Sequence, residues 1–82
     1  MISLQFFARY REVLGDHIQT LPYQAQWRTV ADLRAALIEQ GGDWQVLSDS
    51  GLMCALNDEM CKLDSQLQAG DRVAFFPTVT GG

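Results

Sequence analysis

Residues 29–42, TVADLRAALIEQGG, encode the one convincing helix of the chain. Thr29 is a favourable N-cap, and Asp32 is a short variant of the capping-box acid that also favours the helix dipole. Apolar side chains at positions i, i+3, i+6 and i+7 form one stripe: Val30, Leu33, Ala36 and Leu37. Gly41-Gly42 then ends the helix. The stretch predicts a helix with one face on the core.

Short strand-like segments surround this helix. Two precede it, at residues 1–8 and 18–23, and three follow it, at residues 52–57, 60–63 and 72–76. A mixed sheet of about five strands packed on one main helix accounts for this order. The sequence therefore predicts an α+β fold of the β-grasp, or ubiquitin-like, type.

The connections carry weaker signals. Residues 9–14 predict one helical turn, which Gly15 ends as a left-handed cap. Residues 44–47 predict a second short turn, and Asn57-Asp58-Glu59 a reversal of the chain. We expect residues 1–77 to form one domain and residues 78–82 to form a flexible tail.

Composition excludes several classes of function. The chain has 82 residues, which is one small domain, and a net charge of −4, which disfavours a nucleic-acid surface or a polybasic membrane anchor. The longest apolar run, Leu52–Leu56, is too short to cross a membrane. The first residues lack the pattern of a secretory signal. We therefore expect a cytoplasmic protein.

The reactive side chains do not assemble into a catalytic motif. Cys54 and Cys61 are too few for a disulfide scaffold, and we interpret them as reduced thiols used for packing. With a single histidine, they also lack the ligand spacing of a zinc site. No phosphate-binding loop, dinucleotide fingerprint or nucleophile elbow is present. The sequence predicts a protein that is not catalytic alone.

The most informative feature is the C-terminal pair Gly81-Gly82. These glycines neither cap a predicted helix nor form a predicted turn. A C-terminal carboxylate that enters a narrow cleft of another protein requires residues without a Cβ atom. We therefore interpret the tail as a substrate whose carboxylate is activated and then displaced; the alternative is a frayed end without a function.

The alternation of side chains between the two faces of each predicted strand indicates a docking patch next to this tail. In the last strand, Val73 and Phe75 share one side, whereas Phe76 lies on the other side. The same alternation places Phe7 and Met60 outward among polar neighbours. A cluster of outward apolar residues on one sheet face is typical of a protein-binding surface. We expect these three residues to lie together, with Phe75 in the core.

Two stretches resemble a known family. Residues 64–82, DSQLQAGDRVAFFPTVTGG, closely resemble the C-terminal signature of the small subunits of molybdopterin synthase, which are sulfur carriers in molybdenum cofactor synthesis. Residues 4–12, LQFFARYRE, also resemble that family. The departures are Thr78, where a second proline is common, and Cys61-Lys62 in the fourth strand. The resemblance covers the whole chain.

This resemblance implies a function and a set of partners. A separate adenylating enzyme would use ATP to convert the Gly82 carboxylate to an acyl-adenylate, and a sulfur donor would replace AMP to leave a thiocarboxylate. The large subunit would bind the carrier, with contacts that include Pro77 and Val79, in a heterotetramer with two copies of each subunit. There the sulfur would pass to cyclic pyranopterin monophosphate. The carrier itself would hold no permanent cofactor or metal.

Two alternatives remain open. One is a sulfur carrier for thiamine synthesis or tRNA thiolation, against which the run Phe75-Phe76-Pro77 argues. The other is a ubiquitin-like interaction module whose tail takes part in no reaction.

Overall fold

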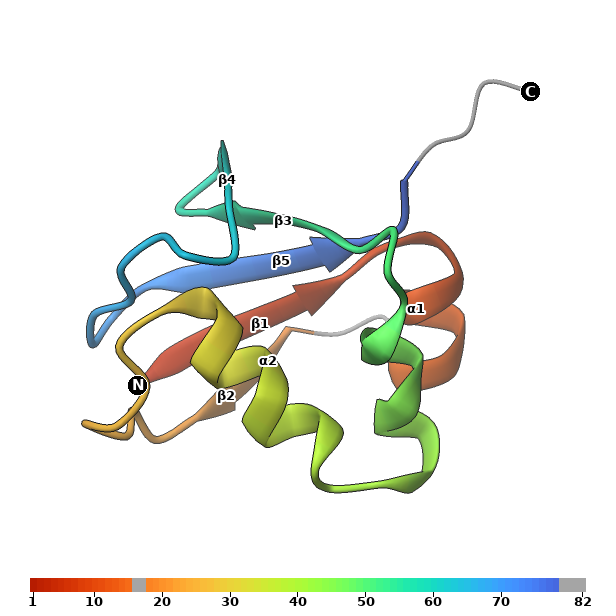
Figure 1. Ribbon diagram of the computed structural model, residues 1–82, viewed down its shortest axis with the longest axis horizontal. Helices are drawn as coiled ribbons and strands as arrows, with labels where there is room; N and C mark the ends of the chain where they lie inside the picture. The colour runs from red at the N-terminus through yellow and green to blue at the C-terminus, as the bar shows by residue number, and fades with distance from the viewer. Residues whose placement is uncertain (16–17, 79–82) are drawn as a thin grey trace.

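The computed structural model describes residues 1–15 and 18–78. Five strands form one sheet: β1 (Ile2–Phe6), β2 (Gln19–Leu21), β3 (Met53–Leu56), β4 (Glu59–Cys61) and β5 (Arg72–Phe76). Three helical segments accompany them: α1 (Ala8–Leu14), α2 (Val30–Ile38) and the 3₁₀ helix η1 (Gly42–Ser48). The strand order is β2-β1-β5-β3-β4, with β1 and β5 parallel at the centre and the other pairs antiparallel (Figure 1). The predicted mixed sheet on one main helix is confirmed.

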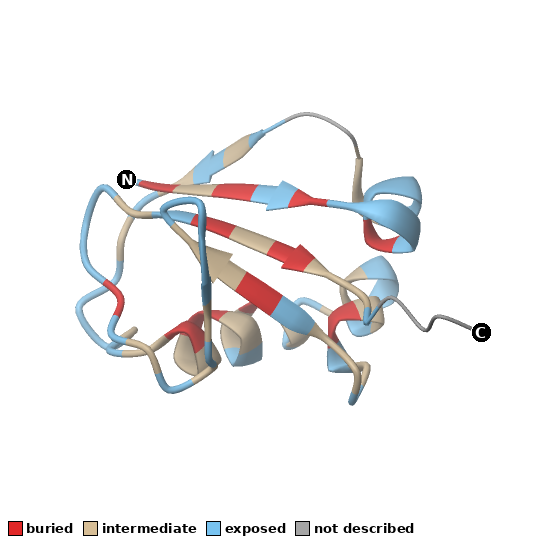
Figure 2. Cartoon of the chain, turned by 90° about the horizontal axis from the view of Figure 1, so that it is seen from above, coloured by how far each residue is buried: buried red, intermediate tan, exposed pale blue. Residues whose placement is uncertain are grey.

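The core lies between the sheet and the helices. Figure 2 shows α2 and η1 on one side of the sheet, and buried residues alternating along the central strands. In β1 the inward residues Ile2, Leu4 and Phe6 are buried, and in β5 the inward residues are Val73 and Phe75. The other buried apolar side chains are Tyr10, Val30, Leu33, Leu37, Leu47, Cys54 and Leu67. The period-2 alternation therefore assigned the two faces of the central strands correctly.

Helix α2 begins as the sequence predicts. The Thr29 hydroxyl accepts a hydrogen bond from the Asp32 backbone N–H at 3.3 Å, and the Asp32 carboxylate accepts one from the Thr29 N–H at 3.1 Å. This reciprocal capping box satisfies two backbone donors that the helix leaves unpaired. Gly41 and Gly42 follow the helix with φ of 74° and 56°, values that favour glycine.

The chain around α1 differs from the prediction. β1 ends at Phe6 rather than at residue 8, because Phe7 is the N-cap of a helix that begins at Ala8. The Gly15 N–H donates to the carbonyl of Arg11, and the residue has φ 112° and ψ 156°. The φ is positive as expected, but the predicted left-handed cap is wrong, because this ψ extends the chain away from the helix.

The β3–β4 hairpin is also tighter than predicted. Asn57 and Asp58 have φ of 52° and 70°, the signature of a two-residue turn of type I′. Glu59 therefore pairs with Leu56 and belongs to β4, not to the turn. As a consequence β4 ends at Cys61, and the predicted strand over residues 60–63 is shifted toward the turn.

Smaller differences affect the ends of other elements. The predicted strands at residues 18–23 and 52–57 are shorter in the structure, and the turn predicted at residues 44–47 is the longer helix η1. No helix among the described residues is both long and apolar enough to cross a membrane.

Candidate functional site: the outward sheet face and the start of the tail

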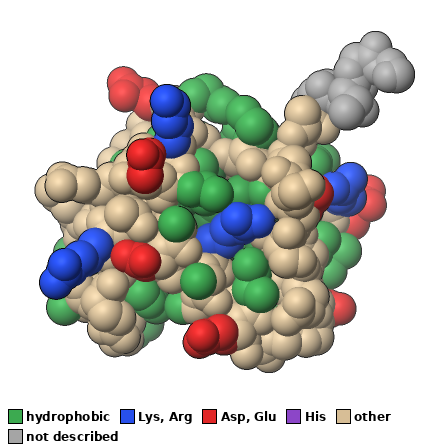
Figure 3. Space-filling view, in the orientation of Figure 1, with side chains coloured by type: hydrophobic (Ala, Val, Ile, Leu, Met, Phe, Trp, Pro, Cys, Tyr) green, Lys and Arg blue, Asp and Glu red, His purple; other side chains and the backbone are tan. Residues whose placement is uncertain are grey.

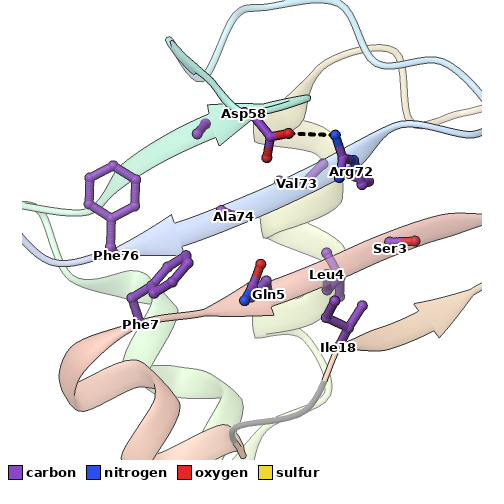
Figure 4. Close-up of a pocket in the computed structure, with 11 residues that line it drawn as sticks. Ser3, Leu4, Gln5, Phe7, Ile18, Asp58, Arg72, Val73, Ala74 and Phe76 are labelled. Atoms are coloured by element: carbon purple, nitrogen blue, oxygen red, sulfur yellow. Dashed lines mark hydrogen bonds and ion pairs between the residues drawn. The ribbon is translucent and has the colours of Figure 1, made fainter.

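The sheet face turned away from α2 carries the predicted docking residues. Phe7, directly after β1, and Phe76, the last residue of β5, lie side by side because the two strands run parallel in register. Their ring centroids are 6.4 Å apart at an interplanar angle of 80°, an edge-to-face contact (Figure 4). The expected proximity of these two residues is confirmed.

Met60 lies on the same face but farther from this aromatic pair. It faces Ala55 across the β3–β4 pairing, and Ala55 in turn faces Ala74 of β5. Met60, Ala55 and Ala74 therefore form one row across the strands, and Phe76 belongs to the neighbouring row. Strand β3 separates Met60 from Phe76. Its side chain is 62% exposed, so it is free to contact a partner.

Met53 completes this surface and was not predicted from the sequence. It pairs with Phe76 across β3 and β5 and is 37% exposed. The alternation of Met53 with buried Cys54 was a sufficient signal, because neighbouring residues in a strand point to opposite faces. We call Phe7, Met53, Met60 and Phe76 the outward apolar patch.

A shallow hollow of about 240 Å³ lies on this face (Figure 4). Phe7 and Phe76 bound one end, and the ion pair between Arg72 and Asp58 bounds the other. The side chain of Ala74 between them is short, so space remains above the central strand. Because both charged side chains are exposed, their pairing adds little stability and leaves them available to a partner.

The chain leaves the sheet beside the loop that connects η1 to β3. The Thr78 backbone N–H donates to the carbonyl of Gly51 at 3.1 Å, and the Thr78 hydroxyl donates to the same oxygen. Pro77, a predicted partner contact, is half-buried at this point. The other predicted tail residues, Val79, Gly81 and Gly82, lie outside the described residues.

Asp49 holds this loop against α1. One carboxylate oxygen accepts hydrogen bonds from the Tyr10 hydroxyl at 2.8 Å and from the Arg9 guanidinium, and the other accepts from the Gly51 N–H at 3.1 Å. The Tyr10 hydrogen bond is the main reason that the pKa of Asp49 lies below its ordinary value of 3.8. Burial, and then this hydrogen bond, raise the pKa of Tyr10 to about 12, so its hydroxyl stays a donor. The start of the tail is therefore attached to α1 through one carboxylate.

We expect Asp49→Asn to destabilise the fold at neutral pH and to do so less in acid. A carboxyl group whose pKa falls on folding stabilises the folded state above its unfolded pKa, and this contribution disappears as pH falls through the folded value. Urea denaturation of both proteins at pH 7 and at pH ~3 measures the difference, and Asp64→Asn, at an exposed carboxylate, is the control. A stability difference that is the same at both pH values would contradict this assignment.

Side chains of both charges are mixed on the face of the molecule that carries α2. On the face drawn in Figure 3, Lys and Arg side chains are scattered among Asp and Glu and form no continuous basic surface. Within residues 1–15 and 18–78, no three His, Cys, Asp or Glu side chains gather into a metal site. What this part of the chain offers is an apolar surface beside the start of the tail.

Comparisons with known proteins relate this chain to a family and to solved structures. Residues 4–82 match the ThiS family. The chain is 40% identical over 83 residues to the molybdopterin synthase sulfur carrier subunit of Escherichia coli, with all of both chains covered. Its fold is similar to that of SAMP1 from Haloferax volcanii, at a TM-score of 0.76 and 25% identity, covering 99% of this chain and 98% of that one.

A further structure contains two different subunits. It is a complex of subunits 1 and 2 of molybdopterin-converting factor from Helicobacter pylori, similar to this chain at a TM-score of 0.62 and 23% identity, covering 99% and 97% of the two chains. At that identity the likeness concerns the fold. From its match to residues 4–82 and its full-length similarity to a curated relative, the chain belongs to the ThiS family, in the group of molybdopterin synthase sulfur carrier subunits.

Proposed function

We propose that this protein carries sulfur as a thiocarboxylate on Gly82 and donates it to cyclic pyranopterin monophosphate inside molybdopterin synthase. The observation that supports this most directly is the outward apolar patch, which lies beside the start of a chain segment ending in Gly-Gly. A partner that binds the patch also receives the tail. Membership of a family of sulfur carriers supports the same function.

The chemistry requires activation by another enzyme. A carboxylate is a poor electrophile, so the Gly82 carboxylate would first attack the α-phosphate of ATP on an adenylating enzyme and release pyrophosphate. A sulfur donor would then displace AMP and leave the thiocarboxylate. ATP is thus used by the activating enzyme, and we propose no permanent cofactor for the carrier.

The proposed partner is the large subunit of molybdopterin synthase, in a heterotetramer with two copies of each chain. The two-subunit complex from Helicobacter pylori supports a pairing of this kind, because one of its chains shares this fold. The net charge of −4 suits a basic partner, and a phosphorylated substrate needs basic residues that an acidic carrier does not provide. We place this reaction in the cytoplasm, where free thiols such as Cys54 and Cys61 persist.

Two experiments test the proposal. In the first, mass spectrometry of the C-terminal peptide from cells should detect the replacement of one oxygen by sulfur, and an unmodified tail would favour an interaction module. In the second, the loaded protein, a large subunit and cyclic pyranopterin monophosphate should together yield the dithiolene product. Loading without product would favour the thiamine or tRNA-thiolation pathway.

The two cysteine thiols are expected to be dispensable for this transfer. In the double variant Cys54→Ala and Cys61→Ser, the reconstituted reaction should keep its full yield, because the reacting sulfur is attached to Gly82. The free energy of unfolding should fall by up to ~3 kcal/mol, since Cys54 is buried. A folded double variant that loads normally but does not transfer sulfur would count against the proposal.

A further inference from the structure

Two thiols face each other on the inner side of the β3–β4 hairpin. Cys54 and Cys61 are directly opposite in the antiparallel register, and their Sγ atoms are 3.3 Å apart. Both are free thiols. Cys54 is only 2% exposed, whereas Cys61 is half-buried on the edge strand. The proposed sulfur transfer uses neither of them.

The hairpin geometry suits a covalent bond between them. Directly opposed residues of an antiparallel pair have Cα atoms about 4.5–5.5 Å apart, within the range of about 4.4–6.8 Å that disulfides span. The two sulfur atoms must approach by about 1.2 Å to reach the bond length of ~2.05 Å. We expect rotation of the two side chains, with a small approach of the two strands, to supply this movement while the strand register stays unchanged. The reduced hairpin is therefore already arranged for closure.

We propose that Cys54 and Cys61 form a reversible dithiol–disulfide site that exchanges with low-molecular-weight disulfides such as oxidised glutathione. The Cys61 thiolate attacks the glutathione disulfide, forms a mixed disulfide and releases one glutathione thiolate. The Cys54 thiolate then attacks Cys61 Sγ and releases the second glutathione. The two protein thiols lose two electrons and two protons, and one glutathione disulfide becomes two molecules of glutathione.

The order of the two steps follows from the environment of each thiol. Cys61 lies on the edge strand and is only half-buried, so we expect a dissolved disulfide to react with it first. Burial, together with the neighbouring Cys61, raises the pKa of Cys54 to about 12, so few Cys54 thiolates exist at neutral pH. Cys54 is therefore a poor nucleophile toward a disulfide in solution, and its second-step attack, after loss of its proton to solvent, is favoured by the 3.3 Å separation of the two sulfur atoms.

Within residues 1–15 and 18–78, no third metal-ligating side chain joins the pair. The bond would tie the short edge strand β4 to β3. Met60, the residue before Cys61, belongs to the outward apolar patch, so oxidation would also fix the strand that presents it.

The test uses the full chain in glutathione buffers of increasing oxidised fraction, followed by acid quenching, alkylation and mass spectrometry. We expect both thiols of the natural protein to disappear together, with an intramolecular disulfide between Cys54 and Cys61 in the peptide map. Glutathione should add to Cys61 in Cys54→Ala at least ten times faster than to Cys54 in Cys61→Ser. Thermal melts confirm that both variants are folded.

Several outcomes would overturn the proposal. One is a natural protein that keeps both thiols alkylatable in the most oxidising buffer. Others are glutathione adducts that accumulate without closure, and disulfides that form only between two chains. Equal rates in the two single variants would overturn the assignment of Cys61 as the entering thiol. The result for the natural protein does not depend on the folding of any variant.

Discussion

Deletion of Gly82 is expected to abolish sulfur transfer while leaving the melting temperature of the protein unchanged. Without this residue, the carboxylate that the adenylating enzyme must reach is displaced by one residue and no longer follows two glycines. The buried core side chains lie between Ile2 and Phe75, and the last described anchor is Thr78, so the deletion removes none of these contacts. Thiocarboxylate formation, product yield and thermal unfolding are the three measurements.

The variant Gly81→Phe tests the same idea without shortening the chain. An aromatic side chain here would obstruct entry into a cleft shaped for a chain without Cβ atoms, so loading and transfer should both fail. Glu39→Gln, at an exposed residue just after α2, is the control and should behave like the natural protein. A protein lacking Gly82 that still forms a thiocarboxylate and supports product formation would refute the proposed function.

Phe76→Ala is expected to weaken binding to the large subunit by ~30-fold or more, which corresponds to ~2 kcal/mol. Phe76 lies on the outward apolar patch, against Phe7 and opposite Met53, and the tail starts two residues later at Thr78. Loss of its ring would remove the contact that sets where the tail enters the partner. Titration calorimetry with the large subunit measures this change.

The stability of the free protein distinguishes a role of Phe76 in binding from a role in packing the core. Phe76 is half-buried and touches Phe7, so its truncation should cost about 1 kcal/mol. Phe75, one residue earlier, is fully buried and stacks near Phe6, so Phe75→Ala should cost roughly 3–5 kcal/mol. If Phe76→Ala binds normally, the outward apolar patch is not the docking surface.

The sequence predicted which face of the sheet each strand residue occupies better than it predicted the turns between the strands. Alternation along β1 and β5 identified Phe75 as inward and Phe7 and Phe76 as outward, because a strand offers only two directions to its side chains. The register of the β3–β4 hairpin was missed, because it depends on positive φ at Asn57 and Asp58. Asn and Asp tolerate that conformation better than most residues, so they indicate a turn but do not fix which residues pair across it.

Part of the candidate site could not have been predicted from the chain alone. Asp49 and Tyr10 are distant in sequence and meet only because α1 and the segment after η1 pack at the same end of the sheet (Figure 1). No spacing rule connects two such residues. The facing pair Cys54 and Cys61 was missed for a related reason, since their contact follows from the hairpin register.

The anchoring of Thr78 on Gly51 limits how far the end of the chain can reach. A fully extended chain spans at most about 3.6 Å per residue, so each residue after the anchor adds no more than that length to the reach of the tail. While this anchor holds, an enzyme that acts on the tail must therefore approach the loop that carries Gly51. The anchor thus fixes the point from which the tail extends, and lengthening the tail by one residue would move the reactive group by up to ~3.6 Å.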